Sequence, residues 1–173
     1  MKTLLFEIGV EEIPARFIEP AKEGLAKSLQ ENLNAARLPF SEIKIFATPR
    51  RLTAFVHELA EKQDETVIVK YGPPYNRAFD DVGNPTKAAV GFAKSKGVEV
   101  AELKKGQKDG VDFVIVERSE KGEPTIAVLP ELLKDVIGKI PFQKKMRWGS
   151  ESFEFARPIQ WLLILFENEQ INV

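Results

Sequence analysis

Residues 3–33 read TLLFEIGVEEIPARFIEPAKEGLAKSLQENL, and this stretch decides the fold class because it places a strand directly before a helix. Residues 3–10 form an apolar run of strand length, which predicts a buried strand. Leu25, Leu29 and Leu33 recur every four residues and would form one apolar stripe on a helix. The chain is therefore expected to begin with a strand that leads into an amphipathic helix.

Prolines shape both ends of this helix. Pro14 follows Ile13 and suits the first helical turn, where its missing N–H leaves no hydrogen bond unmade. Pro20 lies inside the helical pattern and is expected to kink the helix or to split off a short first turn. Pro39 comes just after the expected helix end near Leu38.

The rest of the chain alternates further strands and helices. Strands are expected at 43–47, 52–59, 67–69, 113–118 and 159–166, and helices at 86–96 and 129–140. The first two of these strands flank the turn TPRR at 48–51, and Gly97 suits the left-handed end of the first helix. Because the elements lack the spacing of repeated β-α-β units, we predict an α+β fold, with mixed, mainly antiparallel sheets packed against three or four helices.

Local composition adds predictions for four segments. YGPP at 71–74 is expected to break the strand before it, and 72–85 is expected to be a loop that offers a possible sub-boundary. GQKDG at 106–110 is typical of a polar turn, and residues 153–155 look strand-like. The nearly continuous apolar run 159–166 is typical of a strand that is covered on both faces.

The composition limits the class of protein. The 173 residues suffice for one domain or two small ones, and 43% hydrophobic with 29% charged residues is ordinary for a soluble globular protein. The net charge of -1 gives no overall attraction to nucleic acid, so such binding would depend on local patches. The absence of cysteine excludes disulfides and suits a reducing compartment. With no signal-peptide pattern and no apolar run of membrane-spanning length, a cytosolic location is expected.

The chain ends within an expected hairpin. Residues 167–169 are expected to form a turn, and residues 170–173 to begin a new extended segment. Natural domains rarely end with half a hairpin. We therefore expect residues 1–173 to be the N-terminal region of a longer gene product, truncated at its C-terminal end.

Few residues offer catalytic chemistry. The sequence has no phosphate-binding loop, no dinucleotide-binding glycine fingerprint and no GxSxG elbow. Its single histidine, His57, lies in an expected strand without the partners of a metal site or triad, and we interpret it as a surface or edge-strand residue. Glu7, Glu11 and Glu12 could act as paired carboxylates, but favourable charge near a helix N-terminus is the preferred interpretation. We predict no catalytic residue and no metal site.

Three arginines are candidates for binding. Arg50 and Arg51 lie in the TPRR turn, where adjacent guanidinium groups can bind phosphate or carboxylate bidentately. Pairing of one arginine with a nearby carboxylate, with the other solvated, is the simpler interpretation. Arg157 lies just before the apolar run that begins at Ile159.

The segment Lys144 to Gly149 reads KKMRWG and is the strongest candidate for RNA binding. Lys144, Lys145 and Arg147 can neutralise backbone phosphates, and Trp148 can stack on an unpaired base. An equally good interpretation is a helix-to-strand connector, in which the tryptophan packs into the core and the lysines are solvated.

Several groups of residues occur in a fixed order and together resemble one family. They are FEIGVEEIP at 6–14, TPRRL at 48–52, KYGP at 70–73, KAAVGFA at 87–93, KMRWG at 145–149 and FARP at 155–158. The ordered set resembles the start of the β subunit of bacterial glycyl-tRNA synthetase, the heterotetrameric type. The resemblance covers nearly the whole chain, from about residue 3 to residue 166.

The resemblance implies a subunit of an aminoacyl-tRNA synthetase. In that family two alpha and two beta subunits assemble, and the alpha subunit carries the class II site where glycine and ATP with magnesium form the adenylate. No cofactor is therefore expected in this region. The beta subunit is needed for recognition of tRNA(Gly), with an HD-like domain and an anticodon-binding region farther along the chain. The resemblance brings no agreed catalytic residue to residues 1–173.

Three hypotheses follow. In the first, the region supports aminoacylation through tRNA binding and subunit assembly, with Trp148 stacking or bracing and with phosphate contacts from Arg50, Arg51, Lys144, Lys145, Arg147 and Arg157. In the second, it is a purely structural or interface module with no direct tRNA contact. In the third, it is a hydrolase or editing-like domain that uses the glutamates, which the lack of metal ligands and of a placed nucleophile disfavours. No membrane partner is expected.

Overall fold

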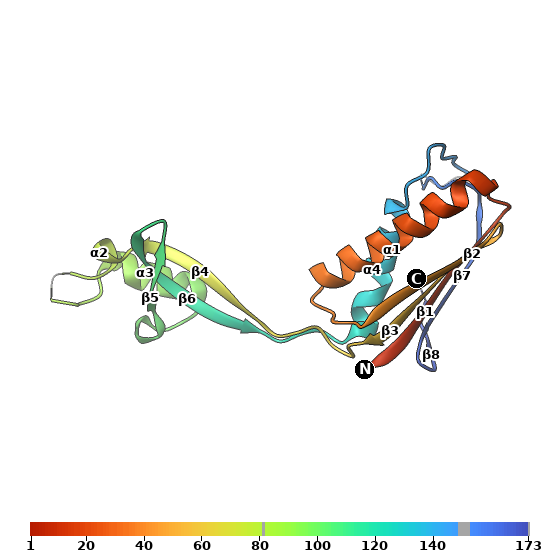
Figure 1. Ribbon diagram of the computed structural model, residues 1–173. Helices are drawn as coiled ribbons and strands as arrows, with labels where there is room; N and C mark the ends of the chain where they lie inside the picture. The colour runs from red at the N-terminus through yellow and green to blue at the C-terminus, as the bar shows by residue number, and fades with distance from the viewer. Residues whose placement is uncertain (81, 149–152, 173) are drawn as a thin grey trace. The chain divides into compact units, whose positions relative to one another are not determined.

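The computed structural model describes residues 1–80, 82–148 and 153–172, and the chain divides into two compact units (Figure 1). Unit 1 comprises Met1–Asp64 and Gly122–Val173, and unit 2 comprises Glu65–Lys121. Each unit combines helices with an antiparallel sheet, which confirms the predicted α+β class.

Unit 1 contains a five-stranded antiparallel sheet and two long helices. Its elements are β1 (Lys2–Val10), the 3₁₀ helix η1 (Ala15–Phe17), α1 (Ile18–Ala35), β2 (Glu42–Thr48), β3 (Arg51–Leu59), α4 (Thr125–Lys139), β7 (Ile159–Phe166) and β8 (Glu169–Gln170). The strand order is β2-β3-β1-β7-β8. The chain order β1-α1-β2-β3-α4-β7, with β1 between β3 and β7, is the ferredoxin-like arrangement. Unit 2 is inserted between β3 and α4.

Both long helices of unit 1 cover the same face of its sheet (Figure 1). Leu4, Phe6 and Ile8 of β1 are fully buried, and they share one core with Leu25 of α1 and Leu133 of α4. The side chains between them on β1 point to the opposite face, because successive residues of a strand alternate. The first strand and helix therefore form as predicted, and η1 is the separate short turn expected before Pro20.

Residues 159–166 were predicted to be covered on both faces, but the described part of the chain covers only one of them. Ile164 and Phe166 are buried, whereas Trp161 is 41% exposed and Gln160 is also exposed. The helices cover only one face of the sheet, so the other side of β7 stays accessible in unit 1. A continuous apolar run is typical of a doubly covered strand, but here it marks a strand with one open apolar face.

Unit 2 is a three-stranded antiparallel sheet with short helices. Its elements are β4 (Thr66–Pro74), α2 (Tyr75–Ala78), α3 (Lys87–Lys96), the 3₁₀ helix η2 (Val100–Glu102), β5 (Lys104–Lys108) and β6 (Val111–Glu120), and the strand order is β4-β6-β5. Its buried cluster consists of Ala78, Ala89 and Val114, with aromatic side chains only partly buried around it.

The helix α3 forms as the sequence predicts. The Thr86 hydroxyl caps its start by accepting a hydrogen bond from the Ala88 N–H, at 3.2 Å. Gly97 ends the helix with a φ of 67°, in the left-handed region that favours glycine, and its N–H donates to the carbonyls of Ala93 and Lys94.

Two predicted interruptions in unit 2 are wrong. β4 continues through YGPP to Pro74 and α2 follows at once, so residues 72–85 are not one loop, and they lie inside unit 2. β5 covers most of the GQKDG segment, and only Asp109 and Gly110 make the turn, both with positive φ. Pairing with the central strand β6 overrides the local turn composition in both places.

Two boundaries in unit 1 also differ from the predictions. α4 begins at Thr125, four residues earlier than expected, and it contains Pro130. The strand-like residues 153–155 do not form a strand, since only an isolated bridge joins Met146 to Phe155. The described residues between α4 and β7, 140–148 and 153–158, are called the connector.

Candidate functional site

Three segments that are distant in the sequence meet at one end of the unit 1 sheet. The N–H of Val10 donates to the carbonyl of Arg50 at 3.0 Å, and the N–H of Glu11 donates to that of Pro158 at 3.1 Å. The N–H of Ile13 donates to the carbonyl of Pro49 at 2.7 Å. The segments EEIP, TPRR and FARP are thus joined by backbone hydrogen bonds into a single corner.

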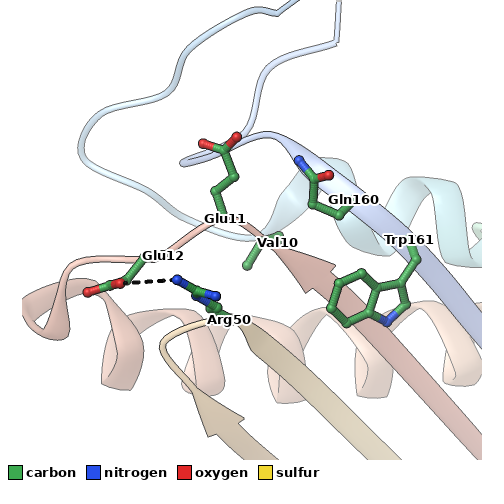
Figure 2. A pocket seen from close by; sticks show the side chains of 6 residues that line it. All are labelled: Val10, Glu11, Glu12, Arg50, Gln160 and Trp161. Atoms are coloured by element: carbon green, nitrogen blue, oxygen red, sulfur yellow. Dashed lines mark ion pairs between the residues drawn. The ribbon is translucent and has the colours of Figure 1, made fainter.

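An open hollow of about 510 Å³ lies at this corner (Figure 2). It is lined by Val10, Glu11, Glu12, Arg50, Gln160 and Trp161. The Arg50 guanidinium lies 3.8 Å from the Glu12 carboxylate, and these side chains are 72% and 71% exposed. Such an exposed ion pair contributes little to stability and leaves the arginine accessible. The simpler interpretation of the sequence expected one TPRR arginine to pair with a carboxylate and the other to be solvated, whereas Arg51 also lies beside a carboxylate, that of Glu7.

The second arginine of the turn belongs to a cluster around Glu7. The Thr53 hydroxyl donates to one Glu7 oxygen at 3.1 Å, and the Trp161 indole N–H donates to the other at 3.0 Å. The Arg51 guanidinium lies 4.0 Å from the carboxylate and 5.6 Å from the centre of the indole ring. These contacts hold a carboxylate that is only 15% exposed, and they fix the orientation of the tryptophan.

A glycine makes room for this tryptophan. Gly9 lies opposite Trp161 in the β1–β7 register, and a Cβ atom at position 9 would overlap the indole ring. Gly9 and Trp161 were not predicted from the sequence to lie together. The available signal was a glycine inside an apolar strand, which often marks a close approach of another group.

The three glutamates do not form a paired acid and base. Glu7 lies in the middle of β1, so its interpretation as helix N-terminal charge is wrong, and its carboxylate is already bonded to Thr53 and Trp161. Glu11 and Glu12 are exposed in the connection before η1. The described residues contain no group of three His, Cys, Asp or Glu side chains that could hold a metal, and none of their helices is suited to crossing a membrane.

His57 lies within the sheet of unit 1 and packs beside an aromatic ring. It lies on β3, which is an interior strand of the sheet and not an edge strand, and its ring stacks near that of Phe55 with 6.5 Å between centres. It is half-buried. Interpretation as an edge-strand residue is therefore wrong.

The cations of the connector are displayed on the surface of unit 1. Lys144, Lys145 and Arg147 are all exposed, whereas Gly149 lies outside the described residues. The Lys145 ammonium donates to the carbonyl of Gly138 at 3.3 Å, and the Arg147 Nε donates to Glu154 at 2.8 Å. A second open hollow of about 510 Å³ lies beside the Lys145 and Arg147 side chains.

Aromatic side chains anchor this connector. Trp148 is half-buried and packs against the unit 1 core, with its ring edge-on to Phe153 at 6.1 Å between centres. Phe155 is buried and meets Phe142 edge-on at 4.8 Å. Arg157 is half-buried, and its guanidinium donates to backbone carbonyls of Glu12 and Ala156. The described part of the connector is therefore anchored to unit 1 and exposes three cations.

The described part of the chain is thus a ferredoxin-like unit with an inserted small unit, a corner hollow of mixed charge and a cationic surface at Lys144, Lys145 and Arg147. A family model described as glycyl-tRNA synthetase beta subunit matches residues 4–173. The chain belongs to the glycyl-tRNA synthetase beta subunit family, which confirms the resemblance found in the sequence.

Individual relatives agree with this assignment. The chain is 48% identical over 172 residues to the glycine–tRNA ligase beta subunit of Moorella thermoacetica, covering 99% of the chain and 25% of the relative. It is 47% identical to that of Halothermothrix orenii over 99% of the chain and 24% of the relative. It is 45% identical to that of Syntrophus aciditrophicus over 97% of the chain and 24% of the relative. The chain thus spans about a quarter of the length of these relatives.

Proposed function

We propose that this region supports the ATP-dependent attachment of glycine to tRNA(Gly) through tRNA binding and subunit assembly. The tRNA contact is made by the cations of the connector, Lys144, Lys145 and Arg147. The alpha subunit supplies the site that uses ATP and magnesium. The observation that carries the proposal is the display of three exposed cations on an anchored loop, in a chain whose relatives are named as glycine–tRNA ligase beta subunits.

Anchoring makes the connector a better phosphate-binding surface than a free loop. Because Trp148 and Phe155 pack against the core, less conformational freedom is lost when neighbouring cations bind a rigid RNA backbone. The ion pair of Arg147 with Glu154 is surface-exposed, so exchanging the carboxylate for a phosphate costs little. Arg50 adds a further exposed guanidinium group at the corner for the same purpose.

Two of the residues predicted to contact tRNA, Trp148 and Arg157, have mainly structural contacts in unit 1. Trp148 packs on the core and braces the connector, so it is not assigned a stacking contact with a base. Arg157 bonds the backbone of the corner through the carbonyls of Glu12 and Ala156, so part of its guanidinium is already engaged.

The test is tRNA(Gly) binding by the assembled alpha–beta complex as a function of salt. Replacing Lys144 and Lys145 by alanine removes two phosphate contacts, and each lost contact lowers the steepness of log affinity against log salt by roughly 0.7–0.9. Lys27 of α1 and Lys134 of α4 provide the matched double substitution, since both are exposed lysines on the helices. An unchanged slope for the connector variant, equal to that of the control, would refute the tRNA contact.

The second candidate function is a structural or interface module without tRNA contact. The core packing of Trp148 and the backbone bonds of Arg157 favour it. It predicts that Trp148→Ala lowers the free energy of unfolding while the connector lysines leave both tRNA affinity and salt slope unchanged. Size-exclusion chromatography of the alpha–beta complex then distinguishes an interface role from a tRNA contact. Substitution of the connector lysines should dissociate the complex if the connector is an interface, and it should leave the complex intact if the lysines contact only tRNA.

A further inference from the structure

The face of the unit 1 sheet opposite α1 and α4 is the open face, and it carries large apolar side chains. The register places Leu5 opposite both Phe55 and Leu165, and it places Glu7 opposite Leu163. Phe46 lies beside Phe55 with ring centres 5.9 Å apart, edge-on. Trp161, whose side chain is drawn in Figure 2, lies opposite Gly9 in the β1–β7 register and adds its indole ring to this surface.

A solvated sheet face does not have this composition. An antiparallel sheet with one face in water alternates apolar residues toward the core with polar residues toward the solvent. Here the side chain of Phe46 remains 55% exposed and that of Trp161 41% exposed. Leu5, Leu163 and Leu165 on the same face are half-buried. A contiguous apolar surface of this kind marks an interaction site.

Charges of opposite sign lie next to each other on the open face. The Lys44 ammonium lies 3.0 Å from the Glu42 carboxylate, and Arg51 lies beside Glu7. Glu7 also places a negative charge near the centre of the surface. Such a face offers no net positive field to a polyanion, so it suits a polypeptide better than RNA.

The size of the face distinguishes between polypeptide partners. Four strands of seven to nine residues span roughly 19 by 25 Å, on the order of 500 Å². A stable complex between separate proteins buries about 800 Å² on each partner, whereas contacts between domains of one chain begin at about 600 Å² in total. The family relatives are about four times as long as this chain, so their remaining length can supply such a domain.

We propose that another segment of the same beta-subunit polypeptide packs on the open face. This segment presents apolar side chains to Phe46, Phe55 and the leucines. It places a carbonyl or carboxylate oxygen near Arg51, whose side chain is exposed and whose ion pair with Glu7 is long. The inference rests on family membership and not on tRNA binding, so the two proposals can fail separately.

Cysteine modification in the full-length beta subunit, without alpha subunit or tRNA, tests this contact. Phe46→Cys places a thiol on the open face, and Lys27→Cys places one on the exposed side of α1, where the lysine side chain is 78% exposed. Lys44→Cys is a second probe of the open face that removes no apolar contact. Peptide mass spectrometry measures the modification rate at each position.

The proposal predicts that both open-face thiols react at least about tenfold more slowly than the thiol at position 27, since burial excludes the reagent. Denaturant should remove the difference. Equal rates in the beta subunit alone would overturn the proposal. If added alpha subunit or tRNA then slowed the open-face thiols, that molecule would be the occupant instead.

Discussion

The two units of this chain are stabilised in different ways. Unit 1 buries large aliphatic and aromatic side chains between one sheet face and two helices, as Phe6, Leu25 and Leu133 illustrate. The buried cluster of unit 2 contains only Ala78, Ala89 and Val114 among the described residues. A small core yields little hydrophobic free energy, so unit 2 depends more on strand pairing, helix caps and turn contacts.

The largest expected effect is the loss of stability when a buried side chain of each unit is shortened. Leu133→Ala should lower the free energy of unfolding of unit 1 by about 2–5 kcal/mol, because the side chain is fully buried and leaves a cavity. Val114→Ala in unit 2 should cost only about 2 kcal/mol, as two fewer methyl groups are buried. Urea unfolding followed by amide hydrogen exchange separates the units. Loss of protection throughout unit 1 in the Val114 variant would contradict the division into two units.

The next largest effect is expected from substitution of Gly9, which lies opposite Trp161. Gly9→Ala should destabilise unit 1 by about 1–3 kcal/mol, because the added Cβ displaces the Trp161 indole. Gly138→Ala in α4 is the matched control: nothing lies near its Cβ position, and it should stabilise the helix by about 0.5–1 kcal/mol. The indole N–H resonance of Trp161 should shift when its bond to Glu7 is lost. An unshifted resonance in the Gly9 variant would refute the close packing.

A smaller effect is expected at the start of α3 in unit 2. Thr86→Ala removes the hydroxyl that accepts from Ala88 and donates to the Arg77 carbonyl at 2.7 Å, and it should cost about 1 kcal/mol. Hydrogen exchange of the first α3 amides measures this loss. Ser95→Ala, at an exposed hydroxyl late in the same helix, should be close to neutral. Equal effects of the two substitutions would argue against a specific cap.

The smallest expected effect is a pH response in unit 2. The Asn84 N–H donates to the Asp80 carboxylate at 2.7 Å, and this bond, with further donors in the loop, lowers the pKa of Asp80 from its ordinary value of 3.8. Because the folded pKa is depressed, the stabilisation is present above pH 3.8 and is lost as the pH falls through the folded pKa. The Asn84 amide resonance should titrate with a midpoint below 3.8. A midpoint at or above that value would contradict the hydrogen bond.

The elements that could be predicted from the sequence are those with local signals. The first strand, α1 and α3 follow from apolar periodicity, proline positions and the Thr86 and Gly97 caps. The end of β4 and most of β5 could not be predicted, because YGPP and GQKDG carry turn residues. Both become strands through hydrogen bonds to β6, a partner that local composition does not identify.

The charged residues of the candidate site were predictable, but Trp161 and the arrangement of the site were not. Exposure of Lys144, Lys145 and Arg147 was expected from charge alone. The contact of Glu7 with Trp161 joins residues separated by 154 positions, and it exists only because β7 pairs with β1. The same long-range pairing brings the apolar side chains of β1 and β7 together on the open face, which local composition alone does not predict.

Photo-crosslinking of the assembled complex tests the proposed tRNA contact most directly. A benzophenone amino acid replaces Lys144 in the full-length beta subunit, and in a matched variant it replaces Lys27, an exposed lysine of α1. The complex with the alpha subunit is irradiated with labelled tRNA(Gly), and the crosslinked RNA is measured. A crosslink from position 144 that is competed by unlabelled tRNA(Gly), with none from position 27, is the predicted result. No crosslink from position 144 under conditions where the complex binds tRNA would contradict the account.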